Sequence, residues 1–137
     1  MKKKACIDTG IITQLYSKEP PKSILHFMDS IKAGKIEAYV LSPIIVEAFF
    51  HICKLKGKAN AETMIATFLK MYPLKIVNFN RSLIFKAGIL KCQHRAELSY
   101  NDCYAIAFSL NKKITFHTTE KSLSKILPTL KLKTYNF

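Results

Sequence analysis

Short apolar runs alternate with longer amphipathic segments along the chain, and this alternation limits the folds that the chain can adopt. The short runs have the length of strands, whereas the segments between them repeat apolar residues at the three- and four-residue spacing of a helix face. Strands that alternate with helices form a mainly parallel sheet with helices on both faces. We therefore predict an α/β protein of the three-layer α/β/α type.

Pro and Gly residues help to delimit the elements. Pro20 and Pro21 separate the first two helices and Gly57 ends the third, while Ser42 and Pro43 have the chemistry of a helix start. Strands are predicted at residues 5–7, 38–41, 75–77 (at a sheet edge), 114–116 and 130–134. Helices are predicted at residues 11–16, 24–31, 44–53, 59–71, 82–95, 99–110 and 121–127. No repeat or linker-like composition divides the chain, so we expect a single domain over residues 1–137.

The chain is strongly basic. It has 22 Lys and Arg against nine Asp and Glu, a formal net charge of +13 at pH 7. Such a charge favours a polyanionic partner, of which nucleic acid is the natural candidate. All the basic residues except Arg81 and Arg95 are Lys, so a solvated basic surface is the alternative on charge alone.

The cysteines and the N-terminal segment bear on the compartment. The four cysteines contain no C-x-x-C pair and are predicted to be reduced, mostly buried thiols: Cys6, Cys53, Cys92 and Cys103. Lys2, Lys3 and Lys4 resemble the start of a signal peptide, but Asp8 interrupts the apolar region that follows. No apolar run approaches the ~20 residues of a membrane span. We expect a soluble, cytoplasmic protein.

Four of the nine acidic residues lie in or beside apolar stretches: Asp8, Glu47, Asp102 and Glu120. A buried carboxylate needs a cation, hydrogen bonds or a helix terminus to compensate its charge. Asp8 and Glu120 follow predicted strands, so we expect them to meet where the strand order reverses, with helices delivering Glu47 and Asp102. Carboxylates that close together repel one another. Mg²⁺ or Mn²⁺ would cancel this repulsion, since hard cations prefer oxygen ligands.

Three of these acids also have a purely structural explanation. Asp8 lies between a strand and a helix and can cap that helix, and Asp102 can form a capping box with Ser99. Glu120 precedes a short helix, where a negative charge is favourable. Glu47 differs, because its neighbours are apolar and it lies beyond the residues at which capping operates.

Four segments of the chain together resemble a known family. They are Cys6-Ile7-Asp8-Thr9, Glu47 in the helix after the second strand, Asn101-Asp102-Cys103-Tyr104-Ala105-Ile106-Ala107, and Ile114 to Glu120. In order and spacing they are similar to the PIN domain, most of all to the compact VapC-like toxins of toxin–antitoxin pairs. The resemblance covers essentially the whole chain. It implies a mainly parallel five-stranded sheet and a metal-dependent ribonuclease site.

The resemblance implies a role for each acid. Asp8, Glu47 and Asp102 fall on acidic positions of the family, whereas Glu120 stands where the family usually has Asp. Asp8, Asp102 and Glu120 would hold one or two Mg²⁺ or Mn²⁺ ions, and Glu47 would complete the catalytic pocket. Bound metal would activate water and stabilise the charge that develops on the phosphate during hydrolysis of an RNA phosphodiester bond.

Other residues are candidates for supporting roles. Thr9 and Thr118 are predicted to orient a carboxylate or bind water, with a turn or cap role as the alternative. His51 shares a helix face with Glu47. We expect it to be a hydrogen-bonded core histidine, and a contact with a phosphate or a metal-bound water is its other candidate role. Three lysines just beyond the Glu47 helix are predicted to contact the RNA backbone: Lys54, Lys56 and Lys58. The alternative is that they only form a solvated helix end.

The resemblance also implies a homodimer and a small antitoxin protein that inserts a segment into the acidic groove. One helix carries an apolar stripe that is either a dimer interface or part of the core: Ile24, Phe27, Met28 and Ile31. Two other functions stay open beside a toxin ribonuclease. One is a PIN endonuclease that processes ribosomal RNA, and the other is a non-catalytic PIN-fold module that binds RNA or protein, an alternative raised by the replacement of Asp by Glu120.

Overall fold

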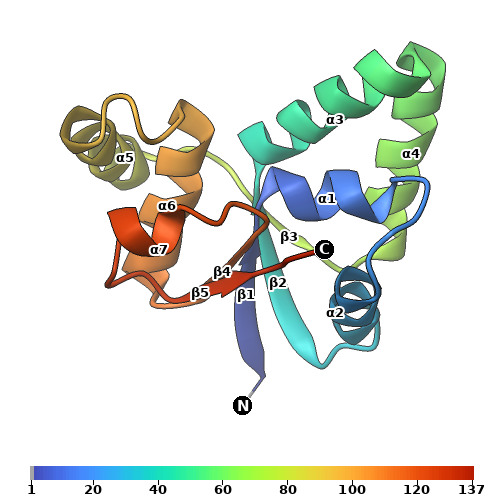
Figure 1. Ribbon diagram of the computed structural model, residues 1–137, viewed down its shortest axis with the longest axis horizontal. Coiled ribbons are helices and arrows are strands. Elements are labelled where there is room, and N and C mark those ends of the chain that lie inside the picture. The colour runs from blue at the N-terminus through green and yellow to red at the C-terminus, as the bar shows by residue number, and fades with distance from the viewer. Residues whose placement is uncertain (1) are drawn as a thin grey trace.

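The computed structural model describes residues 2–137, and Figure 1 shows strands alternating with helices as predicted. The strands are β1 Lys3–Ile7, β2 Ile36–Leu41, β3 Lys75–Val77, β4 Thr115–Thr118 and β5 Leu132–Thr134. The helices are α1 Thr9–Leu15, α2 Lys22–Lys32, α3 Ser42–Lys56, α4 Lys58–Met71, α5 Arg81–Gln93, α6 Tyr100–Lys112 and α7 Leu123–Ile126.

The five strands form one parallel sheet in the order β3-β2-β1-β4-β5. The predicted parallel α/β sheet is confirmed, and β3 lies at an edge as expected. From β1 the chain proceeds outward through β2 to β3, and then returns across the sheet to β4 and β5. The strand order therefore reverses between β1 and β4, which is where open α/β sheets bind their ligands.

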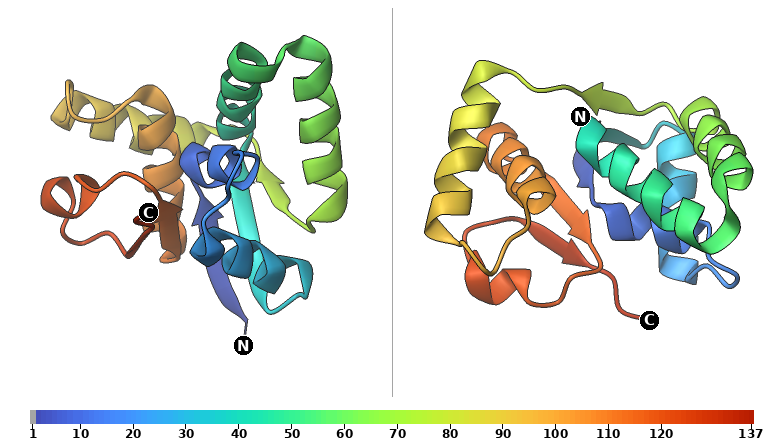
Figure 2. Two further views of the ribbon diagram at one scale, coloured as in Figure 1. Left: turned by 45° about the vertical axis from the view of Figure 1, so that its right-hand side comes forward. Right: turned by 90° about the horizontal axis from the view of Figure 1, so that it is seen from above.

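Helices cover both faces of this sheet. Helices α1 to α4 lie on one face and α5 to α7 on the other, as Figure 1 and the right-hand view of Figure 2 show. This distribution follows from right-handed crossovers, because the chain changes direction across the sheet after β3. Helix α1 follows β1 on one face of the sheet, and α6 precedes β4 on the other face. Both helices therefore border the same edge of the sheet.

The core joins the sheet to both helix layers. Cys6 and Ile7 of β1 and Phe116 of β4 are fully buried. The apolar stripe of α2 is also buried, with no member more than 4% exposed: Ile24, Phe27, Met28 and Ile31. This stripe therefore belongs to the core and is not a dimer interface, which decides between the two interpretations left open by its spacing.

A few details differ from the sequence-based predictions. Helix α7 has four residues rather than seven, because residues 121 and 122 form a turn ahead of it. Ser42 is the first residue of α3, and the preceding Leu41 makes no side-chain cap. Cys6 and Cys103 are buried, but Cys53 is half-buried and Cys92 is exposed. The prediction that the thiols are mostly buried is therefore only partly correct. None of the described helices is long and apolar enough to cross a membrane.

Candidate metal centre

Three acidic side chains meet where the strand order reverses. Asp8 directly follows β1, Glu120 lies two residues after β4, and Asp102 stands in the first turn of α6. One oxygen of each carboxylate lies within 4.8 Å of the others. Asp8 and Asp102 are buried, while Glu120 is exposed. The structure thus brings together the three residues that the sequence predicts as metal ligands.

Two of these acids also cap helices. Asp8 Oδ1 accepts a hydrogen bond from Thr9 N at 2.8 Å at the start of α1. Asp102 N donates to Ser99 Oγ at 3.1 Å, and Ser99 N donates to Asp102 Oδ2 at 3.3 Å, which is the predicted capping box. The structural explanation and the clustering are therefore both correct. Capping fixes each carboxylate, and every carboxylate oxygen keeps a further lone pair for a ligand.

Thr118 connects Asp8 to the segment that carries Glu120. Its buried hydroxyl donates to Asp8 Oδ2 at 2.7 Å and accepts from Glu120 N at 3.1 Å. One side chain at the end of β4 thereby orients a carboxylate at the end of β1 and holds the backbone at Glu120. The contact with a carboxylate and the turn contact, the two roles considered for Thr118, are thus both present, and a functional role for Thr118 stays a prediction.

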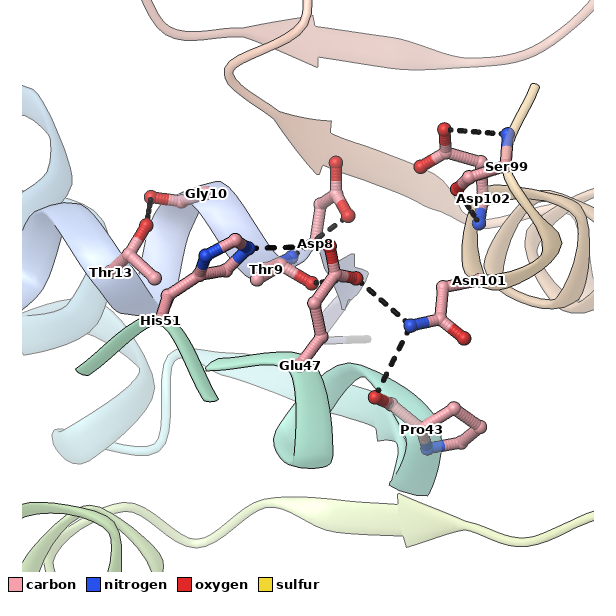
Figure 3. A network of polar contacts seen from close by, with 10 residues as sticks. All are labelled: Asp8, Thr9, Gly10, Thr13, Pro43, Glu47, His51, Ser99, Asn101 and Asp102. Carbon is pink, nitrogen blue, oxygen red and sulfur yellow. Dashed lines mark hydrogen bonds and ion pairs between the residues drawn. The ribbon is translucent and has the colours of Figure 1, made fainter. Parts of the chain in front are cut away.

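Glu47 lies beside the three acids and is held from two sides. Its Oε1 accepts from Thr9 Oγ1 at 3.0 Å and from Asn101 Nδ2 at 2.9 Å, as Figure 3 shows. Asn101 Nδ2 also lies 3.4 Å from Pro43 O. Glu47 therefore links the starts of α1, α3 and α6. The part played by Asn101 was not predicted, and its position next to Asp102 was the only signal for it in the sequence.

His51 faces the other oxygen of Glu47. Its Nε2 is 3.5 Å from Glu47 Oε2, and 39% of its side chain is exposed. The prediction that it shares a helix face with Glu47 is confirmed, whereas the expectation of a core histidine is wrong, because a large part of the side chain is open to solvent.

The lysines after Glu47 lie elsewhere on the molecule. Lys54 and Lys56 are ~10–14 Å farther along the axis of α3, at ~1.5 Å per residue. Lys54 Nζ is 5.1 Å from the centre of the Phe50 ring, Lys56 Nζ donates to a backbone carbonyl at 3.0 Å, and Lys58 Nζ lies 4.0 Å from a glutamate of α4. They do not join the acidic cluster, and their contact with RNA stays a prediction.

The three clustered acids resist ionisation. Burial raises the pKa of Asp8 to about 7 against the lowering effect of its hydrogen bond from Thr118, and the charge of Asp102 adds to the rise. Loss of hydration also raises the pKa of Asp102 and that of Glu120. Within residues 2–137, the acids that lie within 4.0 Å of a basic nitrogen do not include these three: they are Glu37, Glu47, Glu62 and Glu97.

This donor set fits a divalent cation. Three carboxylates without a basic partner offer hard oxygen ligands and an excess of negative charge, which suit Mg²⁺ or Mn²⁺. A sequence model of the PIN domain matches residues 5–126. The chain belongs to the PIN domain family. A search of curated protein sequences finds no match.

Solved structures of VapBC and VapC proteins share this fold. VapBC2 from Rickettsia felis, bound to a DNA fragment from its promoter, superposes with a TM-score of 0.78 at 20% identity over 97% of this chain and 99% of that chain. VapBC-1 from nontypeable Haemophilus influenzae superposes with a TM-score of 0.73 at 13% identity, over 96% of this chain and 97% of that chain. VapC20 from Mycobacterium tuberculosis, a toxin that cleaves the sarcin-ricin loop, has a TM-score of 0.64 at 16% identity, over 82% of this chain and 86% of that chain. The PIN fold implied by the sequence motifs is confirmed.

We expect Asp8→Asn to stabilise the protein in the absence of divalent metal at pH 8. Because the pKa of Asp8 rises from 3.8 to about 7 on folding, its contribution to stability is complete below pH 4 and is lost as the pH rises through 7. The loss amounts to at most about 4 kcal/mol. Thermal unfolding in a chelating buffer between pH 4 and pH 8 measures it. Mn²⁺ should then raise the Tm of the wild type much more than that of the variant.

The exposed Asp29 provides the matched control, because Asp29→Asn removes the same charge outside the cluster. It should leave both the pH dependence and the effect of Mn²⁺ unchanged. An Asp8→Asn protein that is less stable than the wild type at pH 8 in chelator, or equally stabilised by Mn²⁺, contradicts the electrostatic description of the centre.

We expect Gly10→Ala to weaken Mn²⁺ binding about 10- to 100-fold, the usual effect of disturbing the support of a metal ligand. A Cβ at Gly10 would overlap the Thr119 hydroxyl and lie 3.1 Å from Thr119 Cβ and Cγ2, displacing the segment that holds Glu120. Calorimetry with Mn²⁺ measures the affinity. Adding Thr119→Ala to Gly10→Ala should restore part of it, and unchanged affinity in Gly10→Ala would show that this contact does not position Glu120.

Proposed function

We propose that this PIN protein is an endoribonuclease that hydrolyses RNA phosphodiester bonds with the help of Mg²⁺ or Mn²⁺. The convergence of Asp8, Asp102 and Glu120 within 4.8 Å, without a basic partner, is the observation that carries the proposal. A divalent ion at these carboxylates would supply water activation and stabilisation of phosphate charge. The members of the cluster come from three separate elements, and such convergence is typical of a functional site.

The surrounding side chains have distinct roles in this proposal. Asp8, Asp102 and Glu120 hold the ion, and Thr118 keeps Asp8 in the orientation that its hydrogen bond defines. Thr9 and Asn101 occupy Glu47 Oε1, which leaves Oε2 towards His51 and the crevice. Glu47 Oε2 is thus available to accept a hydrogen bond from a water molecule or a ribose hydroxyl.

The charge of the chain supports a nucleic acid substrate. At pH 7 the formal net charge is +13, so phosphate binding would release counterions and depend on salt. A single-stranded or looped RNA suits a site that must reach a flexible backbone. Lys54, Lys56 and Lys58 already contact protein groups, and we propose them as secondary contacts to the RNA backbone.

The biological role that we propose is the cytoplasmic toxin of a toxin–antitoxin pair, acting as a homodimer and neutralised by a small antitoxin. The support is the similarity of fold to VapBC proteins, including a toxin described as cleaving the sarcin-ricin loop. Processing of ribosomal RNA and a non-catalytic binding role are the alternatives.

We expect the wild type to cleave a structured RNA in the presence of Mn²⁺. Asp8→Asn should cleave it at least roughly 100-fold more slowly, because the variant loses a ligand and its charge. Gel analysis of end-labelled RNA measures the rate, with Asp29→Asn as the control of unchanged activity. Equal cleavage by the wild type and Asp8→Asn removes the assignment. A chain that binds no Mn²⁺ in calorimetry, and binds RNA equally well with Asp102→Asn, is a binding module.

We expect induced expression in a bacterial host to arrest growth if the nuclease is a toxin, since cleavage of essential RNA stops translation. Co-expression of the small protein encoded next to it should relieve the arrest, and Asp8→Asn should not cause it. Growth curves with matched protein levels provide the measurement. Normal growth with a catalytically active wild type would favour an RNA-processing role.

A further inference from the structure

A hollow of about 320 Å³ lies between α5 and α6. Its lining includes Ile84, Gly88 and Lys91 from α5 together with Tyr100 and Tyr104 from α6. A Cβ built on Gly88 meets no atom within 4 Å, so the floor of the hollow is open at this point. The side views in Figure 2 show α5 and α6 lying next to each other.

Tyr100 is the unusual member of this lining. It is the first residue of α6 and 70% exposed, although its ring is large and mostly apolar. Tyr104 lies one turn later and packs against Phe79 with ring centres 4.4 Å apart, so packing explains its presence. Among the described residues Tyr100 has no such aromatic partner, and most of its ring is open to solvent and to a planar ligand.

Lys91 holds a positive charge beside this ring. Its ammonium donates to Arg95 O at 2.8 Å and Leu98 O at 2.7 Å, and it lies 4.9 Å from the centre of the Tyr100 ring. A lysine ammonium has three donors, so one remains for a ligand. Two backbone carbonyls therefore fix a charge over one face of an exposed aromatic ring, and the opposite face is left for a planar ligand.

The hollow and the acidic centre lie on different sides of the first turn of α6. Tyr100 precedes Asp102 by two residues, ~3 Å along the helix axis, and the two side chains leave the helix on different sides. An RNA chain that passes the start of α6 with a phosphate at the acidic centre could therefore place a neighbouring base here.

We propose that this hollow binds one base of the RNA substrate, stacked on the Tyr100 ring, with the remaining N–H of Lys91 directed to the neighbouring phosphate. The proposal rests on the proposed function, in which RNA is the ligand of the acidic centre. Stacking on an exposed aromatic ring is tolerant of sequence, and a basic groove next to it is the common arrangement for single-stranded nucleic acid. The net charge of +13 favours RNA over an apolar protein segment as the occupant.

The test measures binding of a short single-stranded oligoribonucleotide, with Asp8→Asn present in every protein to prevent turnover. Tyr100→Ala should weaken binding about 5- to 100-fold, the range for loss of one base stack. Tyr100→Phe should have the same affinity as the protein that keeps Tyr100. Phe85→Ala is the matched control, because Phe85 is 61% exposed and has Arg81 at 5.9 Å from its ring. It should leave the affinity unchanged.

A fluorescent variant reports stacking directly. The chain contains no Trp, so Tyr100→Trp introduces a single indole whose emission should be quenched by the oligoribonucleotide, and less by one with abasic sites. Unquenched emission, or an affinity unaffected by Tyr100→Ala, overturns the proposal and makes this surface a candidate for protein contacts. If the wild type with Mn²⁺ cleaves RNA while these results are negative, only the base site fails. If stacking is seen but no cleavage occurs, only the nuclease assignment fails.

Discussion

The hydrogen bond from Thr118 to Asp8 joins the two strands between which the sheet reverses its order, and the acidic centre depends on it. Parallel pairing aligns β1 with β4 so that Ile7 is opposite His117, and Asp8, the first residue after β1, donates a backbone hydrogen bond to His117 O beside Thr118, the last residue of β4. The Thr118 hydroxyl then binds the Asp8 carboxylate and the backbone of Glu120. A crevice that open sheets form by topology is thereby given a fixed arrangement of carboxylates.

Helix starts reduce the cost of placing these carboxylates in a buried site. Asp8 caps α1 and Asp102 caps α6, so backbone N–H groups already stabilise part of their negative charge. Their pKa values are nevertheless raised, because burial outweighs the caps. Capping therefore holds the ligands in place without neutralising them. The remaining negative charge is what a divalent cation can compensate.

Most of the fold and the core of the site could be predicted because their signals are local. Apolar periodicity and Pro or Gly positions located the elements, and placing Asp8 and Glu120 after strands was enough to predict their convergence. The bond between Asn101 and Glu47 and the contact of Gly10 with Thr119 join elements far apart in the chain. Such contacts depend on how helices approach one another, which periodicity does not encode. The same reason explains why the expectation that His51 is a core histidine is wrong.

Glu120 is the residue in which the chain departs from the usual acidic pattern, and contacts on either side of it hold its backbone. Its backbone N is bonded to Thr118 Oγ1, and the preceding Thr119 lies against Gly10, where a Cβ would not fit. The segment is therefore held close to the start of α1, and Glu120 itself stays exposed beside the buried Asp8 and Asp102. Because one of its oxygens nevertheless lies within 4.8 Å of an oxygen of each of these two carboxylates, replacement of Asp by Glu is compatible with a three-carboxylate centre.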